Sequence, residues 1–444
     1  MSKAKIQPPK AVKTILPVYK SMNRYVQYGI IVLLCFVLYG NTIQNDYALD
    51  DALVITQNSF TQKGISGIGS IFAYDSFKGS GDAFINSVSG GRYRPFSIAS
   101  FAIEYQFFGQ NPHISHFFNI LFYALSCVLL FILLSKIFAQ YTKTHWYNSI
   151  PFIATLLFVA HPIHTEVVAN IKSRDEIFSL LFSLACLWAV LEHLESGKIL
   201  YWILSPLFFI IALLSKEIAV VFIIIIPATL YFFGSQSFKK IASEMIPLLL
   251  VFIAFMYLRN SMIAKTNTDI KYVQDIMNYS FADMNMAQKW ATIVYCLGLY
   301  LKLLFIPHPL TWDYYPYHIQ IMEWTNGLVI LSLAVYLFMT YLFIKGLKSK
   351  SILSYCILVF IVPLGLTANI LFPVGAFMCE RFVYVSSIGF VTLIAWFFAE
   401  YLNKIKLKPL LLLIPILCLF GFKTISRNKA WKDDDTLIET DVKT

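Results

Sequence analysis

Charged residues are scarce in this sequence, and their scarcity excludes most soluble classes of protein. Asp, Glu, Lys and Arg make up 14% of the 444 residues, whereas hydrophobic residues make up 58%. Soluble domains carry about 25% charged residues, so most of this surface cannot face water. The length would otherwise allow about three soluble domains. We predict one membrane-embedded domain in their place.

Paired cysteines are also missing. None of the seven cysteines belongs to a Cys-x-x-Cys pair, and six of them lie inside apolar runs. A disulfide framework or a cysteine-ligated zinc site is therefore not expected. Burial of the thiols as small apolar side chains accounts for this distribution.

Segments of alternating polar and apolar residues are absent, so the long apolar runs predict transmembrane helices and not a barrel. A helix needs about 20 apolar residues to cross a membrane. The expected fold is an all-α polytopic membrane protein with about eleven to twelve transmembrane helices. The candidate segments are 25–42, 116–138, 148–163, 176–194, 199–214, 217–233, 243–258, 287–306, 325–345, 351–372, 383–402 and 409–424.

Acidic residues are lacking from the first 24 residues, which carry six lysines and arginines in front of the first apolar run. Basic segments of membrane proteins stay in the cytoplasm. We therefore expect residues 1–24 to be cytoplasmic and residues 25–426 to form the membrane domain. This placement of the basic residues also argues against nucleic-acid binding, despite the net charge of +10.

The same rule orients the rest of the chain. It places a long first loop, 43–113, and a second polar loop, 259–286, on the external side. Segment 287–306 carries two lysines and ends in an aromatic, proline-containing stretch. We expect it not to cross the membrane fully, which gives eleven crossings and an external tail, 427–444.

Several charged groups fall on this external side, where ionisable residues next to spans are candidates for function. Asp50 and Asp51 follow the first span in "NDYALDDALVI". Adjacent carboxylates there would serve as a general base or bind a metal. A solvated turn or a helix cap is the structural alternative.

Cations follow at three further points of the external side. Arg92 and Arg94, in "GGRYRPF", would hold a phosphate through bidentate contacts or face lipid headgroups. Lys216 and Glu217 lie at a tight turn, where Lys216 would contact phosphate or extend toward the membrane interface. Arg381 follows Glu380, and the two would form an internal ion pair.

A dense polar patch, "FVAHPIHTEVVANIKSRDE", lies between two spans. It holds His161, His164, Glu166 and Arg174. The His-x-x-His spacing would suit zinc, but there is no HExxH motif and Pro162 interrupts a helical presentation. A hydrogen-bonded turn that supports a neighbouring site is the favoured interpretation.

The shared placement of these groups on one face is a stronger argument than any single motif, because random polar turns would fall on both faces. A transporter or flippase would show internal repeats and charges at the membrane midplane, and no such repeat is present. A non-enzymatic membrane scaffold would not need an acidic pair and several cations on one side.

The ordered segments "LDDALVITQN", "YRPFSIASF", "HISHFFNILFYAL", "FVAHPIHTEVVANIKSRDE", "LLSKE", "LFIPHPLTWDY", "ERFVYVSSIGF" and "RNKAWKDDDTL" resemble a known family. From about residue 40 onward the chain is similar to the membrane core of the transmembrane-and-TPR-containing O-mannosyltransferases. These belong with the protein O-mannosyltransferases in the GT-C glycosyltransferase superfamily.

This resemblance implies a GT-C fold whose long first external loop bears the catalytic acid. It implies a polyprenyl-phosphate sugar donor, mannose transfer to Ser or Thr of a protein, and inversion in a single displacement. Asp50 or Asp51 would be the general base. The donor phosphate would be bound by Arg92, Arg94, Lys216 and Arg381. The acceptor side would be lined or braced by His161, His164, Glu166, Arg174 and Glu217.

The resemblance leaves the sugar and the acceptor open, and a lipid or glycan acceptor is an alternative to protein. The resemblance does not fix a cofactor, and a divalent cation is left as an alternative. Family members typically continue into TPR repeats where segment 427–444 stands. The composition suits a bacterial inner membrane, with the active site facing the periplasm and membrane lipid around the spans.

Overall fold

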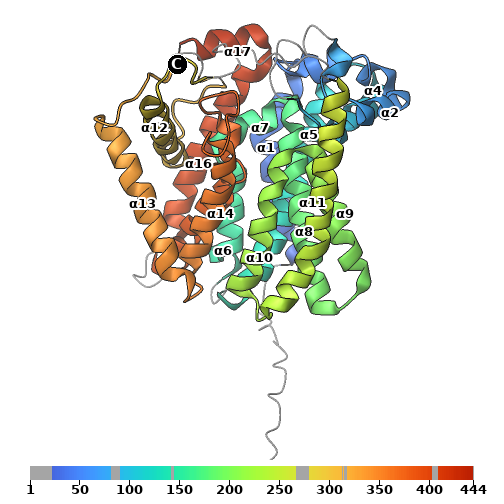
Figure 1. Ribbon diagram of the computed structural model, residues 1–444. Helices are drawn as coiled ribbons and strands as arrows, with labels where there is room; N and C mark the ends of the chain where they lie inside the picture. The colour runs from blue at the N-terminus through green and yellow to red at the C-terminus, as the bar shows by residue number, and fades with distance from the viewer. Residues whose placement is uncertain are drawn as a thin grey trace, which may run out of the picture.

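The computed structural model describes residues 23–81, 91–141, 145–266, 280–312, 314, 318–402 and 409–443. In this part of the chain the regular elements are helices, and no strand occurs. The predicted all-α class is therefore confirmed. Most of the helices run side by side as one bundle (Figure 1).

Within the described residues, six helical stretches are long and apolar enough to cross a membrane. Each stretch consists mainly of one helix. These helices are α1 (Arg24–Tyr39), α5 (Pro112–Ile137), α8 (Arg174–Ser196), α11 (Phe238–Thr266), α13 (Gly327–Leu347) and α16 (Pro409–Asn428). Four further apolar helices are shorter, and they are α9 (Ile199–Ser215), α10 (Phe222–Phe233) with the turn before it, α14 (Ile352–Thr367) and α15 (Ser387–Phe397).

A bent pair adds one more apolar segment. Helix α6 (Ile150–Ala160) is followed by 162–169, which ends in α7 (Thr165–Ala169), and the two parts meet at 54°. Proline disfavours helical backbone in the residue before it, and His161 accordingly has an extended ψ of 121°. With this pair and the four shorter helices, the described chain holds eleven apolar segments, of which six, or seven with the bent pair, are long enough to cross a membrane.

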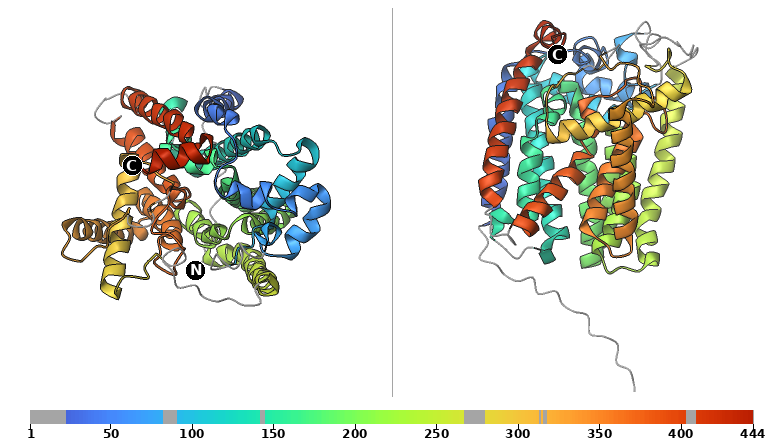
Figure 2. Two further views of the ribbon diagram at one scale, coloured as in Figure 1. Left: turned by 90° about the horizontal axis from the view of Figure 1, so that it is seen from above. Right: turned by 90° about the vertical axis from the view of Figure 1, so that its left-hand side faces the viewer.

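Helix α12 (Met286–Phe305) is the exception to the bundle direction. It is not among the candidate spans, and it lies across the bundle axis near one end, as the two views of Figure 2 show. Asn285 caps its N-terminus in a reciprocal capping box with Gln288. This arrangement agrees with the expectation that 287–306 does not cross.

Local sequence explains the sharp reversals between neighbouring helices. Gly197 ends α8 in the left-handed conformation, with φ of 68°, which a glycine adopts without steric cost. The chain then turns directly into α9, and α8 and α9 pack as an antiparallel hairpin. Pro112, at the first position of α5, and the Asn111 cap fix the start of that helix.

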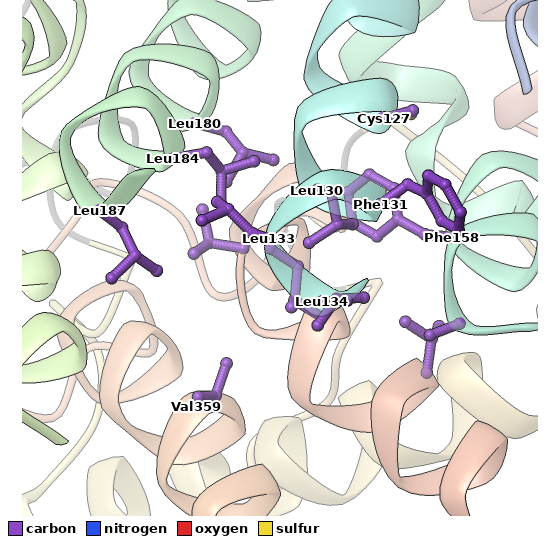
Figure 3. Close-up of a cluster of buried hydrophobic side chains, with 14 of the residues drawn as sticks. Cys127, Leu130, Phe131, Leu133, Leu134, Phe158, Leu180, Leu184, Leu187 and Val359 are labelled. Carbon is purple, nitrogen blue, oxygen red and sulfur yellow. The ribbon is translucent and has the colours of Figure 1, made fainter. Parts of the chain in front are cut away.

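The core is built from apolar side chains that project between helices. Figure 3 shows Leu130, Leu133 and Leu134 of α5 gathered with Leu184 of α8 and Phe158 of α6. All five are largely buried. In lipid such packing stabilises through van der Waals contact, since the surroundings are as apolar as the core.

The predicted external loop 43–113 contains helices of its own, α2 (Ile68–Ala73) and α4 (Pro95–Phe108). Figure 1 shows them at the same end of the bundle as α7 and the last helix, α17 (Asp434–Asp441). The chain passes from α1 to α2 through short irregular turns, and these turns carry Asp50 and Asp51 to this end.

The start of the second expected external loop is helical. Helix α11 continues to Thr266, so it covers the first part of the expected loop 259–286. Residues 259–266 contain neither proline nor glycine, and a helix without a breaker continues beyond the membrane edge at little cost. The rest of that loop from 267 to 279, and the basic segment 1–24 up to residue 22, lie outside the described residues.

Candidate active site

The two adjacent carboxylates occupy opposite environments. Asp51 is 1% exposed. Its carboxylate accepts hydrogen bonds from the backbone N–H groups of Ala48 at 2.9 Å and Lys172 at 2.7 Å. The Asp50 side chain is 51% exposed, and one of its oxygens lies 3.5 Å from Lys172 Nζ. Asp51 therefore joins the first loop to the segment before α8, while Asp50 faces outward.

The same contrast separates their acidities. Burial raises the pKa of Asp51 to about 7, against the lowering effect of the two backbone hydrogen bonds. Burial also acts to raise the pKa of Asp50, but the charges of Lys172, Arg381 and Arg92 outweigh it and lower this pKa below its ordinary value. Asp50 is thus ionised at neutral pH beside three cations.

Two of the expected phosphate-binding cations are already paired with carboxylates. Lys216 Nζ lies 2.6 Å from Glu176 and 3.2 Å from Asp175. Arg94 donates to Asp175 at 2.8 Å and to Glu217 at 3.0 Å. These pairs hold α4, the start of α8 and the turn after α9 together, which leaves Arg94 and Lys216 less available to a ligand.

Lys172 and Arg92 are less fully engaged. Lys172 Nζ lies 3.5 Å from Asp50 and 3.9 Å from Asp175, distances too long for a strong hydrogen bond. The Arg92 guanidinium stacks 5.2 Å from the Phe77 ring centroid. Among the described residues, no carboxylate forms an ion pair with it. Both side chains retain donors for an anion.

Arg92 and Lys172 also line a cavity of about 270 Å³, part of which is open to solvent. Its lining combines charged side chains, among them Arg94 and Asp175, with apolar ones. The lining residues are Val54, Ser76, Phe77, Arg92, Arg94, Ser97, Ile98, Phe101, Lys172 and Asp175. Cations and apolar side chains therefore meet in one lining.

Arg381 reaches the same region from a different part of the chain. Its backbone N–H donates to Glu166 at 2.8 Å, and its guanidinium pairs with the same buried carboxylate. The Arg381 side chain is 24% exposed. Its charge contributes to the lowered pKa of Asp50, so Arg381 acts electrostatically on the open side of Asp50.

The two histidines that were expected to line or brace the acceptor side are hydrogen-bonded inside the fold. His161 Nε2 lies 2.9 Å from the Leu304 carbonyl, and its Nδ1 accepts from the Ile163 N–H. His164 contacts the Phe158 carbonyl and the Ser387 hydroxyl. Both rings are fully buried. In the described chain, no three His, Cys, Asp or Glu side chains are grouped to hold a metal.

Arg174 is likewise internal. Its guanidinium pairs with Glu104 and donates to Asn119 at 2.7 Å and to the Ser115 carbonyl at 3.0 Å. It also lies 4.2 Å from the Phe101 ring centroid and is fully buried. Because its donors are used within the protein, Arg174 joins α4, α5 and α8.

Comparison with known proteins gives consistent matches. A family model described as dolichyl-phosphate-mannose-protein mannosyltransferase matches residues 98–262. A protein O-mannosyl-transferase of Caenorhabditis elegans is 27% identical over 409 residues, covering 92% of this chain and 56% of that protein. Protein O-mannosyl-transferase TMTC3 of Mus musculus is 25% identical over 451 residues, covering 94% of this chain and 47% of that protein.

The chain resembles the protein O-mannosyltransferases along most of its length. The predicted resemblance is thereby confirmed. The chain spans about half the length of the curated relatives it matches. The segment matched by the mannosyltransferase family model contains Lys172 and Lys216 but not Asp50, Arg92 or Arg381. The structure brings both sets of residues together.

Sequence reasoning missed two residues of this charged region, one beside Asp50 and one inside the fold. Lys172 stood inside the polar patch but was not singled out, although it contacts Asp50. Glu104, the partner of Arg174, is a lone carboxylate in the apolar run of α4. An isolated charge in an apolar helix is expensive and predicts a partner, so that signal was present in the sequence.

Proposed function

We propose that this chain is a membrane glycosyltransferase that moves mannose from a polyprenyl-phosphate donor to a Ser or Thr hydroxyl of a protein. One observation carries the proposal. The exposed, ionised Asp50 lies 3.5 Å from Lys172 and feels the charges of Arg92 and Arg381, and Lys172 and Arg92 line a cavity together with apolar side chains. The similarity to protein O-mannosyl-transferases supports the choice of mannose and of a protein acceptor.

The cavity supports a lipid-phosphate donor. Arg92 and Lys172 would bind the phosphate, since neither has its donors fully used by carboxylates. Phe77, Ile98 and Phe101 would contact the first apolar units of the polyprenyl chain. Arg94 and Lys216, which are paired with Asp175, Glu176 and Glu217, would hold the wall of the site and act on the phosphate at longer range.

The reaction is a single displacement. Asp50 takes the proton from the acceptor hydroxyl as that oxygen forms a bond to the anomeric carbon of the sugar. The bond between that carbon and the phosphate oxygen breaks, and its electron pair leaves with the lipid phosphate. The configuration at the anomeric carbon inverts. General-base assistance of this kind contributes about 10²–10⁴-fold to the rate.

The charges around Asp50 suit both halves of this step. Lys172, Arg381 and Arg92 lower the pKa of Asp50, which keeps the base ionised at neutral pH. The same cations stabilise the negative charge that develops on the departing phosphate. Asp51 is unsuited to the role of base, because both of its oxygens accept backbone hydrogen bonds in the interior.

The position of the site within the bundle supports an external active site. Leu49, directly before Asp50, donates to Asp434 of α17. Helices α2, α4 and α17 lie at one end of the bundle, whereas the α8–α9 and α13–α14 turns lie at the opposite end (Figure 1). Those turns carry Lys198 and Lys348, and basic turns face the cytoplasm. The site would then face the periplasm if the host membrane is a bacterial inner membrane.

A transfer assay on the full chain tests the proposal. The purified protein is given polyprenyl-phosphate mannose and a Ser/Thr peptide, or the matched peptide with Ala at each hydroxyl position. We expect mannose on the first peptide alone, and a loss of at least about 10²-fold in Asp50→Asn. Asp435→Asn, an exposed carboxylate at the same end of the bundle, serves as the control.

Each other outcome contradicts a stated part of the proposal. Transfer to lipid but not to peptide would overturn the protein acceptor. Equal activity in wild type and Asp50→Asn would overturn the base. Movement of the donor across proteoliposomes with no product would replace the transferase by a flippase.

A further inference from the structure

The last described helix packs against the turn that carries Asp50. Trp431 and Leu437 are at most 1% exposed and are buried together with Ala48 and Ala169. Figure 1 shows α17 lying across the end of the bundle where α7 is also found. The contact joins residues that are more than 380 positions apart in the sequence.

Backbone hydrogen bonds reinforce this apolar contact. The Leu49 N–H donates to Asp434 Oδ1 at 2.6 Å. The Asp46 N–H donates to the Lys432 carbonyl at 2.8 Å. The C-terminal segment therefore binds the main chain of the Asp50 turn at two points, one of them the residue directly before Asp50.

Leu49 adopts an unusual backbone conformation. Its φ is 51°, in the left-handed region that leucine rarely occupies and that asparagine and glycine tolerate. Such a conformation persists only when its surroundings impose it. The backbone angles at Leu49 set the direction in which the next side chain, Asp50, points. The hydrogen bond from the Leu49 N–H to Asp434 is therefore in a position to fix the orientation of the Asp50 side chain.

The other end of α17 contacts the opposite flank of the site. Asp441 accepts a hydrogen bond from the Trp312 N–H at 2.7 Å. The neighbouring Thr311 N–H donates to Glu380 at 2.7 Å, and Glu380 precedes Arg381. Helix α17 therefore bridges the segment of Asp50 and the segment of Arg381.

We propose that Asp434 is a positioning residue, which holds the left-handed backbone at Leu49 and thereby aims the Asp50 carboxylate at the acceptor hydroxyl. The proposal rests on the proposed function for the role of Asp50. Asp434 touches neither donor nor acceptor. Its effect is exerted through the geometry of the base.

Two neighbouring substitutions test it. Asp434→Ala removes the acceptor of the Leu49 N–H, whereas Asp435→Ala removes another exposed carboxylate from the same first turn of α17. We expect kcat for mannose transfer to fall about tenfold or more in the first variant, because small misplacements of a catalytic group are costly. The donor KM stays within about twofold, and Asp435→Ala behaves as wild type.

Two rescues separate positioning from a general structural role. Asp434→Asn keeps an oxygen that accepts from the Leu49 N–H, so it should retain most of the activity. Leu49→Asn in the Asp434→Ala background supplies a residue that tolerates the left-handed conformation by itself. It should restore at least about a third of the lost kcat. No recovery in either variant would overturn the proposal.

Hydrogen exchange gives a readout that does not depend on activity. In wild type, the amides of Leu49 and Asp50 should exchange more slowly than in Asp434→Ala, with Asp435→Ala unchanged. Equal exchange in all three proteins would overturn the proposal, whether or not mannose is transferred. If wild type transfers no mannose but exchange rises in Asp434→Ala alone, the proposed function fails and the hold of Asp434 on the backbone stands.

Discussion

Two charged regions at the same end of this protein have opposite construction. The first, called here the open cluster, consists of Asp50, Arg92 and Lys172. The second, the closed network, consists of Glu104, Asn119 and Arg174. In the open cluster, the Asp50 carboxylate is half exposed and the cations keep unused donors. In the closed network, Arg174 is fully buried and is hydrogen-bonded on every side.

The difference shows where a ligand can compete for the hydrogen-bond donors of a charged side chain. A buried charge with all its hydrogen bonds made inside the protein would have to break them before it could bind anything else, and breaking such contacts is expensive. A cation that lies at a cavity wall and has only long ion-pair distances is stabilised when an anion binds beside it. The closed network therefore serves the fold, and the open cluster is the region suited to substrate.

The largest expected effect comes from opening the closed network. Arg174→Met leaves the Glu104 carboxylate without its cation in the interior, so we expect a loss of about 3–5 kcal/mol in stability. Thermal unfolding in detergent measures the change. Activity per folded molecule should stay near wild type. Adding Glu104→Leu should recover part of the stability, and a fully additive double variant would show that the two residues do not interact.

The next effect comes from removing a cation of the open cluster. Arg92→Gln should lower transfer by about 10²-fold, because a donor aimed at the developing phosphate charge is lost. The melting temperature should change little, since the guanidinium has no carboxylate partner in the described structure. Arg94→Gln is the matched comparison and should mainly lower stability. The reverse pattern would mean that the two arginines have been assigned the wrong roles.

A smaller effect on stability is expected from substituting Asp51. This residue lies next to the open cluster but, like the closed network, is buried and hydrogen-bonded within the protein. Asp51→Asn turns one acceptor into an N–H that faces a backbone N–H, at a cost of about 1–3 kcal/mol. Thermal unfolding at constant pH measures it. A loss of transfer with unchanged stability would instead place Asp51 in the reaction.

The raised pKa of Asp51 also predicts a dependence on pH. The pKa of Asp51 is about 7 in the folded protein and 3.8 in the unfolded chain, so the folded state binds this proton more tightly. The contribution of Asp51 to stability is fully present below pH 3.8 and is lost as pH rises through about 7. Unfolding measured across this range should show the loss in wild type and not in Asp51→Asn.

The smallest effect is expected on the acidity of the base. Lys172 lowers the pKa of Asp50, so Lys172→Gln should raise it and move the acidic limb of the kcat/KM profile to higher pH. We expect a displacement of about one pH unit. A pH series of the transfer assay measures it. An unmoved limb would show that the limb does not report Asp50, or that Lys172 does not act on it.

The helical architecture was largely predictable from local sequence. Each apolar run predicts its own helix, because the backbone in lipid must satisfy its hydrogen bonds within the segment. Even the departure of α12 from the bundle was indicated by Lys289 and Lys302 at its two ends. The end of α11 was missed, since no proline or glycine marks where that helix leaves the membrane.

The candidate site was predictable as a neighbourhood and not as a set of roles. The clustering of Asp50, Arg92 and Arg381 on one face followed from the order of spans and loops. Their division into free and paired groups did not, because the pairs join distant segments. Arg94 forms an ion pair with Glu217, and Arg174 forms one with Glu104. No local sequence pattern predicts these pairs.

Sequence by itself thus determined the class of the protein, its helical segments and the end of the bundle where the charges collect. These follow from hydrophobicity and length, which act residue by residue along the chain. Tertiary structure decided that Asp50 is exposed while Asp51 is buried, and that α17 reaches Leu49. Burial and ion pairing depend on which segments meet in space, and that is a property of the folded chain as a whole.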